Sequence, residues 1–353
     1  MNPHFWQFFT TAPSIWDGML ADIRNARKSI DIEQYGFYDD QVGRRFLEIF
    51  EEKLKQGVAV RMICDATGSW PLFFSSYVKH LRSLGLEIQS YNRPQIHHPK
   101  LWFYRTHRKL LVIDSQIAWL GGLGMKEKIR NYRDTQARLE GRLVGDVASA
   151  FEDIWQSVQT PKQPLFERQF QESGGIQLMI NYPGYQEKQI YEWLRSAVSA
   201  AQRRIYLTTS YFFPDRNFFQ LILDKAKQGV DVKIILRGKD DEYIPVRFSS
   251  SYFSTALANN IKIYRFMPNV MHAKTFVIDD VASVGSSNLD KFSFYYNLEA
   301  NLVSKNSEFV NALSEQFLTD LKSCRQVTAK EWSERPLRER VFETLVWPIH
   351  NYL

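Results

Sequence analysis

The chain has 353 residues, of which 44% are hydrophobic and 24% charged, and this composition excludes a disordered or low-complexity protein. The length suits one large domain or two ordinary ones. The net charge of +6 is compatible with nucleic acid, phospholipid headgroups or phosphorylated metabolites as partners, without choosing among them. There is no run of about 18 apolar residues and no pattern of a signal peptide, so we expect a soluble or peripheral protein.

Two further features of the composition bear on the environment of the protein. The two cysteines, Cys64 and Cys324, are far apart and match no metal-ligand spacing, so we interpret them as reduced thiols in a reducing compartment. Aromatic residues make up 14% of the chain, and we expect some of the rings to lie at a lipid interface.

The first half of the chain predicts helices alternating with strands. An amphipathic helix over residues 15–26 precedes a strand over 29–32. A longer helix over 43–56 ends before Gly57, the residue type expected just after a helix C-terminus. Two later strands are predicted where the sequence is VAVRMI (58–63) and LLVID (110–114).

The second half predicts the same elements in the same order. Helices over residues 189–201 and 217–228 flank a strand over 204–207, and strands follow over 230–235 and 275–279. The sequence itself also recurs: KQGVAVRMI returns as KQGVDVKII, and HRKLLVID returns as HAKTFVID. Repeated blocks in a constant order indicate an internal duplication. Alternating helices and strands predict an α/β fold with largely parallel sheets.

The boundary between the duplicated halves is predicted near residues 160–175, where proline and glycine cluster. We therefore divide the chain into a first half of residues 1–165, a second half of residues 166–330 and a tail of residues 331–353. An apolar stripe with arginines around it begins in the tail at Leu337. We interpret it either as an amphipathic helix on a membrane surface or as a helix docked on the core.

Each half carries the pattern His-x-Lys-x4-Asp. A lysine two residues after a histidine shares its face in an extended strand. A histidine attacks phosphorus when neutral and donates a proton when charged, while lysines neutralise phosphate oxygens. Two sets therefore supply a nucleophile, an acid and two cations for phosphodiester transfer through a covalent intermediate, with no metal and no cofactor. We predict one active site from six catalytic residues: His107, Lys109, Asp114, His272, Lys274 and Asp279.

Other residues near each pattern complete the predicted site. The two aspartates of the patterns end their strands, so we expect them to act structurally. Asp134 follows His107 by 27 residues and Glu299 follows His272 by the same distance, so we predict that these carboxylates orient the imidazoles. Whether each carboxylate serves its own histidine or the opposite one stays open.

Turns of small residues follow both patterns, GGLG from Gly121 and GSSN from Gly285. Such turns let backbone and short donors approach a phosphate, which predicts roles for Gly122 and Ser286. His98 also has a lysine two residues on, but lacks the later aspartate and the small-residue turn, so we interpret His97 and His98 as loop residues.

These residues resemble those of the phospholipase D superfamily, named for the same histidine, lysine and aspartate. The resemblance covers roughly residues 15–330 and is strongest to bacterial cardiolipin synthases, through SYFFPD, GVDVKIILRGKDD and MHAKTFVIDDVASVGSSNLDKFSFYYNLEANL. It implies two duplicated α/β halves packed face to face with pseudo-twofold symmetry, the active site between them, and a phosphohistidine intermediate. It also implies that Asn288 binds phosphate.

The sequence departs from the family in two places. Gly124 stands where the first motif usually has asparagine, which predicts an asymmetric phosphate pocket. The two N-terminal membrane-spanning helices of many cardiolipin synthases are not recognised here, so the chain resembles the shorter, peripheral members.

The resemblance implies a phosphatidyltransferase that moves a phosphatidyl group between phospholipids and releases a small alcohol such as glycerol. The alternatives are a phospholipase D-type hydrolase that gives phosphatidic acid, a nuclease of the same superfamily, or a scaffold without activity. We expect anionic phospholipids such as phosphatidylglycerol and cardiolipin as partners, no nucleic acid, and a peripheral location on the cytoplasmic face of the bacterial inner membrane. A monomer is sufficient for the site, because one chain carries both motifs.

Overall fold

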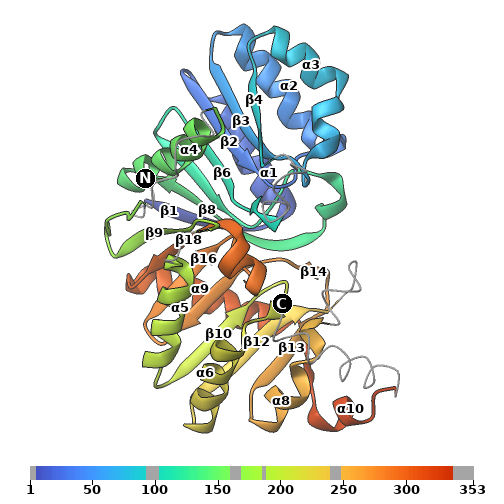
Figure 1. Ribbon diagram of the computed structural model, residues 1–353, viewed down its shortest axis with the longest axis vertical. Helices are drawn as coiled ribbons and strands as arrows, with labels where there is room; N and C mark the ends of the chain where they lie inside the picture. Colours follow the sequence, from blue (N-terminus) through green and yellow to red (C-terminus); the bar gives the residue numbers. More distant parts are fainter. Residues whose placement is uncertain (1–4, 93–102, 160–167, 185–187, 239–247, 337–353) are drawn as a thin grey trace.

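The computed structural model describes residues 5–92, 103–159, 168–184, 188–238 and 248–336. Within these ranges two mixed sheets lie one above the other along the long axis, each with helices packed against it (Figure 1). The predicted α/β class is therefore confirmed. The apolar stripe of the tail and both loop histidines, His97 and His98, lie outside the described residues.

The first sheet is formed mainly by the first half of the chain. Its strand order is β1 (Trp6–Thr11), β8 (Tyr132–Glu140), β7 (Ile117–Gly121), β6 (Lys109–Ile113), β2 (Ser29–Gln34), β3 (Ala59–Asp65) and β4 (Glu87–Tyr91). The helices of this half are α1 (Ala12–Arg24), α2 (Gln41–Lys55), α3 (Ser76–Ser83) and α4 (Arg142–Gln159), with short 3-10 turns at Trp70–Phe74 and Glu127–Ile129.

The second sheet repeats this arrangement. Its strand order is β19 (Cys324–Val327), β13 (Lys262–Phe266), β12 (Asp231–Arg237), β10 (Arg204–Thr208), β15 (Thr275–Ile278), β16 (Val281–Gly285) and β18 (Asn297–Ser304), with β9 (Ile176–Asn181) also on β18. Its helices are α5 (Gln189–Ala200), α6 (Arg216–Lys227), α8 (Phe253–Ala258), α9 (Ser307–Leu321) and α10 (Ala329–Ser333). A small sheet pairs β11 (Phe212–Phe213) with β17 (Leu289–Asp290), and a π-helical turn spans Phe292–Tyr296.

The prediction of largely parallel sheets is wrong. Along the first sheet, β2–β3 and β3–β4 are parallel, whereas the pairs from β1 to β2 are antiparallel. The motif strands β6 and β15 run antiparallel to β2 and β10. A short turn also joins each of them to an antiparallel next strand, β7 or β16. Helical crossovers give parallel pairs, and a tight hairpin gives antiparallel ones.

Side-chain caps fix helix starts that the apolar periodicity placed too late. The helix predicted from residue 15 begins at Ala12, because Thr11 and Ser14 form a capping box around its first turn. The helix predicted from residue 43 begins at Gln41, where the Asp40 carboxylate accepts the N–H groups of Val42 and Gly43.

A shared apolar core joins the two halves. One cluster contains Leu120 and Val147 from the first half together with Val284 and Phe309 from the second. A buried ion pair reinforces the contact, as Arg133 donates from Nε and Nη2 to the Asp320 carboxylate at 2.9 and 2.7 Å. The interface is therefore continuous with the interior of both halves, and the site between them rests on a rigid base.

Two short strands cross from one half to the other. β5 (Arg105–Thr106), which immediately precedes His107, pairs with β18 of the second sheet, and β14 (Val270–Met271), just before His272, pairs with β8 of the first. Each motif histidine therefore enters the site from its own half while its preceding backbone is fixed to the other half. The proposed limits of the halves, at residues 165 and 330, stay a prediction.

Among the described residues, no helix is both long enough and apolar enough to cross a bilayer. Cys64 is buried and Cys324 is partly buried, and both are free thiols.

Candidate active site

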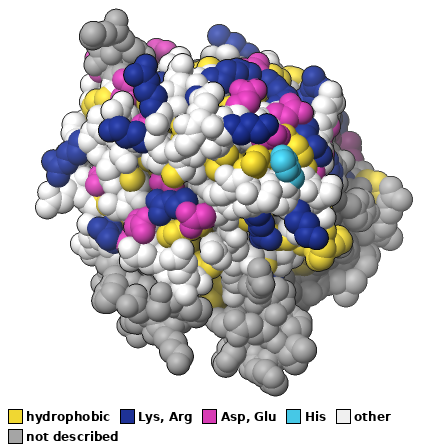
Figure 2. Space-filling view, turned by 90° about the horizontal axis from the view of Figure 1, so that it is seen from above, with side chains coloured by type: hydrophobic (Ala, Val, Ile, Leu, Met, Phe, Trp, Pro, Cys, Tyr) yellow, Lys and Arg dark blue, Asp and Glu magenta, His cyan; other side chains and the backbone are white. Residues whose placement is uncertain are grey.

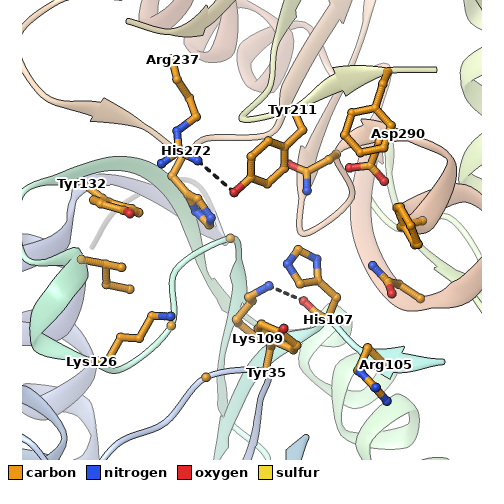
Figure 3. Close-up of a pocket in the computed structure, with 18 of the residues that line it drawn as sticks. Tyr35, Arg105, His107, Lys109, Lys126, Tyr132, Tyr211, Arg237, His272 and Asp290 are labelled. Atoms are coloured by element: carbon orange, nitrogen blue, oxygen red, sulfur yellow. Dashed lines mark hydrogen bonds between the residues drawn. The ribbon is translucent and has the colours of Figure 1, made fainter. Parts of the chain in front are cut away.

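A cavity of about 670 Å³ lies between the halves and contains both motif histidines (Figure 3). Its walls come from the ends of strands and from the turns that follow them. Figure 3 shows His107 and His272 facing each other across its centre. The structure thus brings the two distant motifs into one site, as their duplication predicted.

Each imidazole is held by the carboxylate of the opposite half. His107 Nδ1 lies 2.9 and 3.1 Å from the two oxygens of Glu299, and His272 Nδ1 lies 2.6 Å from Asp134 Oδ2. Both carboxylates are fully buried. When Nδ1–H donates to a carboxylate, Nε2 carries the lone pair of the neutral imidazole and is the nitrogen able to react. This answers the open question of pairing: each carboxylate serves the other histidine.

The pairing of β5 with β18 and of β14 with β8 explains why each histidine binds the carboxylate of the opposite half. The His107 N–H donates to Leu298 O at 2.9 Å, one residue before Glu299. The His272 N–H donates in the same way to Arg133 O at 2.7 Å, one residue before Asp134. Because side chains on paired strands lie in register, the parallel bridge sets each histidine beside the partner carboxylate.

The two lysines lie next to their own histidines. Lys109 Nζ donates to His107 O at 2.5 Å, and Lys274 Nζ contacts both the carbonyl oxygen and Nδ1 of His272, the latter at 3.0 Å. Both side chains are almost completely buried. They are therefore in place to neutralise an anionic group between the imidazoles.

Burial controls the protonation of these groups. Desolvation lowers the pKa of His107, and desolvation together with the Lys274 charge lowers the pKa of His272 well below its usual value. Desolvation also lowers the pKa of Lys109 to about 7 and that of Lys274 to about 8. Burial therefore favours neutral imidazoles and makes both lysines easier to deprotonate than exposed lysines.

The two orienting carboxylates differ in their surroundings. Burial raises the pKa of Asp134 to about 6. The pKa of Glu299 is instead lowered, because His107, Lys109 and the Ser286 hydroxyl outweigh its desolvation. Ser286 Oγ donates to Glu299 at 2.5 Å, whereas Gly122 at the equivalent place in the first half has no side chain to offer Asp134. The two halves therefore differ in how they hold the orienting carboxylates Asp134 and Glu299.

The two motif aspartates, which the sequence placed among the catalytic residues, do not line the cavity and instead bind backbone N–H groups. Asp114 accepts the backbone N–H groups of residues 27–29 at 2.7–2.9 Å, and Asp279 accepts those of residues 202–204 at 2.7–3.0 Å. Both have positive φ, 52° and 46°, at the tight turn that ends the motif strand. Each carboxylate fixes the start of a central strand, which is the structural role that their strand-end position predicted.

Of the predicted phosphate-binding residues, two line the cavity and one does not. Gly122 and Asn288 line it, and the Asn288 amide oxygen makes no hydrogen bond within the described part of the chain. Ser286 lies behind the wall and binds Glu299, so it positions the carboxylate. A Cβ at Gly122 would lie 2.6 Å from Asp134 Oδ1, so only glycine lets that carboxylate reach His272.

Sequence reasoning missed several charged and aromatic residues of the cavity. Tyr35 lies edge-on to the imidazole of His107, with 5.3 Å between ring centroids, and the ring of Tyr132 lies 5.4 Å from that of His272. Three further cations and one acid line the walls: Arg105, Lys126, Arg237 and Asp290.

The sequence did carry a signal for these residues. Asp65 and Arg237 end the equivalent strands β3 and β12, and Lys126 and Asp290 each stand two residues beyond the aligned pair Gly124 and Asn288. Opposite charges at equivalent places mark positions where the duplicated halves have separated in role.

Comparison with known proteins agrees with this geometry. The family model described as "Cardiolipin synthase, PLD-like domain" matches residues 19–155 and 194–321. A cardiolipin synthase of Clostridium perfringens is 30% identical over 95% of this chain and 74% of its own length. Cardiolipin synthase 1 of Staphylococcus aureus is 31% identical over 96% of this chain and 71% of its own length.

The fold also matches a solved structure of low sequence identity. Phosphatidylserine synthase of Haemophilus influenzae superposes with a TM-score of 0.76, at 13% identity, over 100% of this chain and 94% of that one. The likeness at this identity concerns the fold, and it extends over both halves.

Proposed function

This chain belongs to the cardiolipin synthase family of phospholipase D-like proteins, and on that premise we propose that it transfers a phosphatidyl group from one phospholipid to a hydroxyl of another. The observation that carries the proposal is the pair of imidazoles facing each other in one cavity, each with Nδ1 bound to a buried carboxylate of the opposite half. Such a pair supplies a nucleophile and a proton donor on opposite sides of one phosphorus atom.

The first step forms a covalent intermediate. The phosphodiester of phosphatidylglycerol lies between the imidazoles, where Lys109 and Lys274 neutralise its free oxygens. His107 Nε2 attacks phosphorus, the bond to glycerol breaks, and His272 gives its proton to the departing alkoxide. The bound phosphate adds a negative charge beside His272, which raises its pKa and keeps this imidazole protonated for the step.

The second step reverses the proton transfer. The hydroxyl of an acceptor lipid enters where glycerol left, and His272 Nε2 takes its proton. The new O–P bond forms as the bond between His107 and phosphorus breaks. The products are cardiolipin and one glycerol for each pair of phosphatidylglycerol molecules.

We assign the nucleophile to His107 because of its carboxylate. The phosphorylated imidazole is positively charged, and Glu299 stays ionised beside it, since its pKa is lowered and Ser286 holds it. Asp134 is the weaker anion, with its pKa raised to about 6, and suits an imidazole that gains and loses a proton in each cycle.

An aromatic rim, defined as Phe103, Phe292 and Tyr296, suits approach to a membrane. These side chains are 60%, 37% and 39% exposed, and Tyr296 lies 6.5 Å from Phe103 and 5.9 Å from Phe292 between ring centroids. Phe103 and Phe292 also line the cavity. Rings at a wet apolar boundary favour a lipid interface. Peripheral binding to anionic phospholipid at the cytoplasmic face of the inner membrane is part of the proposal.

Other aromatic residues divide among the core, the cavity wall and the surface. Phe294 packs in the core of the second half, while Tyr211 and Phe213 join the cavity wall. Phe74 is 79% exposed and does not line the cavity.

The alternatives within the superfamily differ in what resolves the intermediate or in the donor. A hydrolase would use water in the second step, and the same residues would serve it. For a nuclease we expect a continuous basic surface. Figure 2 shows one end of the molecule, where Lys and Arg side chains are interspersed with Asp and Glu. The lipid donor of the proposal is supported by the relatives, which are cardiolipin synthases.

Purified protein incubated with phosphatidylglycerol vesicles in EDTA tests the proposal, with products followed by mass spectrometry. We expect cardiolipin and glycerol, and no cleavage of single-stranded DNA in a parallel reaction. His107→Ala and His272→Ala should each abolish the products, while His80→Ala, a change at an exposed histidine on α3, should not. Phosphatidic acid alone would identify a hydrolase, and cleaved DNA with intact lipid would rule out both lipid activities.

A further inference from the structure

Arg237 lies in the cavity wall on the side of His272. It ends strand β12, is only 3% exposed, and its Nη1 donates to the Tyr211 hydroxyl at 2.9 Å. Its charge contributes to the lowered pKa of His272. Figure 3 shows its guanidinium beyond His272 as seen from His107. A buried arginine therefore faces the space next to the proton-transferring imidazole.

The first half has no cation at the equivalent place. Asp65 ends β3 as Arg237 ends β12, and its carboxylate accepts the N–H groups of Thr67, Gly68 and Thr106 at 2.9, 2.8 and 3.2 Å. It shapes the turn beside Tyr35 and does not line the cavity. The paired histidines and lysines are nearly symmetric, whereas Arg237 has no counterpart among the described residues of the first half. We therefore expect a role of Arg237 that is specific to the His272 side of the cavity.

The chemistry of transfer makes one side of the site different from the other. In an in-line displacement, the leaving alcohol departs opposite the nucleophile, and the acceptor enters at the same place. With His107 as the nucleophile, this place is on the side of His272. An acceptor phospholipid carries its own phosphodiester, one glycerol unit away from the attacking hydroxyl, whereas free glycerol and water carry none.

We propose that Arg237, fixed by Tyr211, forms a second anion subsite that binds the phosphodiester of the acceptor phospholipid. This inference rests on the proposed function and adds to it the recognition of the acceptor. A guanidinium donates two parallel hydrogen bonds to a phosphate and remains charged at any working pH. Arg105 lines the cavity as well, on the side of His107, and provides the internal comparison.

In the second step the acceptor is thereby positioned before it reacts. While Arg237 binds the acceptor phosphodiester, the free glycerol hydroxyl of that lipid lies beside His272 Nε2. The proton passes to Nε2, the acceptor oxygen bonds to phosphorus, and the bond from His107 to phosphorus breaks. Glycerol and water react at the same phosphorus without this anchor, so the subsite favours a phospholipid acceptor over both.

A competition between two acceptors tests the subsite. The protein is given phosphatidylglycerol vesicles together with deuterated glycerol, and mass spectrometry measures the ratio of cardiolipin to deuterated phosphatidylglycerol. Both products come from the same intermediate, so the ratio reports acceptor recognition and is independent of how fast the intermediate forms. Arg237→Gln should lower the ratio about 10- to 100-fold, the effect of losing a charge-assisted contact. Arg237→Lys should lower it less.

Arg105→Gln is the matched control, because it removes the same charge from the other side of the cavity. It should keep the wild-type ratio. Should Arg237→Gln fail to fold, as judged by thermal unfolding, Tyr211→Phe carries the test, and it should lower the ratio by loosening Arg237.

Two results would overturn the inference. Arg237→Gln could lower both products together at a constant ratio, which would assign Arg237 to the reacting phosphate. Arg105→Gln could lower the ratio instead, which would place the acceptor on the side of His107. Failure of the proposed function would be distinct, because the wild-type protein would then form no cardiolipin, whether it released deuterated phosphatidylglycerol, phosphatidic acid or neither.

Discussion

Glu299→Gln tests whether the carboxylate from the opposite half controls His107. The substitution keeps the size of a fully buried side chain and removes its charge. Glutamine can still accept the Nδ1–H of His107, so the loss reports the charge itself. Separating a buried, hydrogen-bonded charge pair costs about 3–5 kcal/mol. If this stabilisation is present in the transition state and absent from the neutral ground state, kcat falls by about 10²- to 10⁴-fold.

The assay is the rate of cardiolipin formation from phosphatidylglycerol vesicles over a range of lipid concentration. Because Glu299 does not line the cavity, KM should change little while kcat falls. Asp31→Asn is a matched control: Asp31 is a buried carboxylate, bound to Arg61 Nε at 2.7 Å, outside the cavity wall. A folded Glu299→Gln protein that retains more than about a tenth of the wild-type kcat would show that the charge of Glu299 does not control His107.

The Ser286 hydroxyl, which donates to Glu299, provides a second test of whether Glu299 controls His107. Ser286→Ala should lower kcat in the wild-type background, because it removes the 2.5 Å hydrogen bond that holds Glu299. In the Glu299→Gln background it should add little, since a positioning residue acts through the group that it positions. Full additivity of the two losses would show that Ser286 acts independently, for example directly on phosphate.

Three further predictions concern stability, pH and membrane binding. Asp114→Asn weakens contacts with three backbone N–H groups and should lower the free energy of unfolding by about 1–3 kcal/mol, measured by urea denaturation; a catalytic loss without destabilisation would contradict its structural role. Because the pKa of Lys109 is lowered to about 7, the lysine loses its charge as pH rises and kcat/KM should decline above this pH; Lys109→Arg should move the decline to higher pH, and an unmoved profile would exclude Lys109 as its cause. The double change Phe103→Ser with Phe292→Ser should weaken sedimentation with phosphatidylglycerol vesicles, while Leu318→Ser, an exposed residue of α9, should not; equal effects would exclude the aromatic rim as the membrane contact.

The duplication made much of this site predictable from sequence. The repeated spacing identified both histidines, both lysines and both carboxylates. The small-residue turn after the first motif pointed to Gly122, and the family resemblance pointed to Asn288. The family was also correct, because two complete motifs in repeated contexts are specific. Each lysine lies beside its histidine as expected, although the histidines lie between strands, after β5 and β14 and before β6 and β15.

What the sequence left open depends on contacts between distant segments. The exchange of carboxylates follows from the bridges that β5 and β14 make with the opposite sheets, and these short strands carry no local signal. The parallel arrangement was overestimated because the hairpin connections after β6 and β15 were not considered.

Two kinds of site residue were misread for related reasons. Ser286 was read as a phosphate ligand because small residues in a turn suggest close approach, yet its hydroxyl reaches the carboxylate behind the wall. Arg237 was overlooked because it stands in an ordinary strand, and its meaning appears only when it is compared with Asp65 in the other half. The differences between duplicated halves are therefore as informative as the shared motif.

We propose that His107 carries the phosphatidyl group in a single site built by both halves. Rapid quenching of wild-type protein with phosphatidylglycerol, followed by digestion under mildly alkaline conditions and mass spectrometry, detects this intermediate. We expect a phosphatidyl adduct on the peptide that contains His107, formed before cardiolipin and lost as cardiolipin appears. An adduct on His272, or cardiolipin formed within one turnover with no adduct at either histidine, would show that His107 is not the nucleophile.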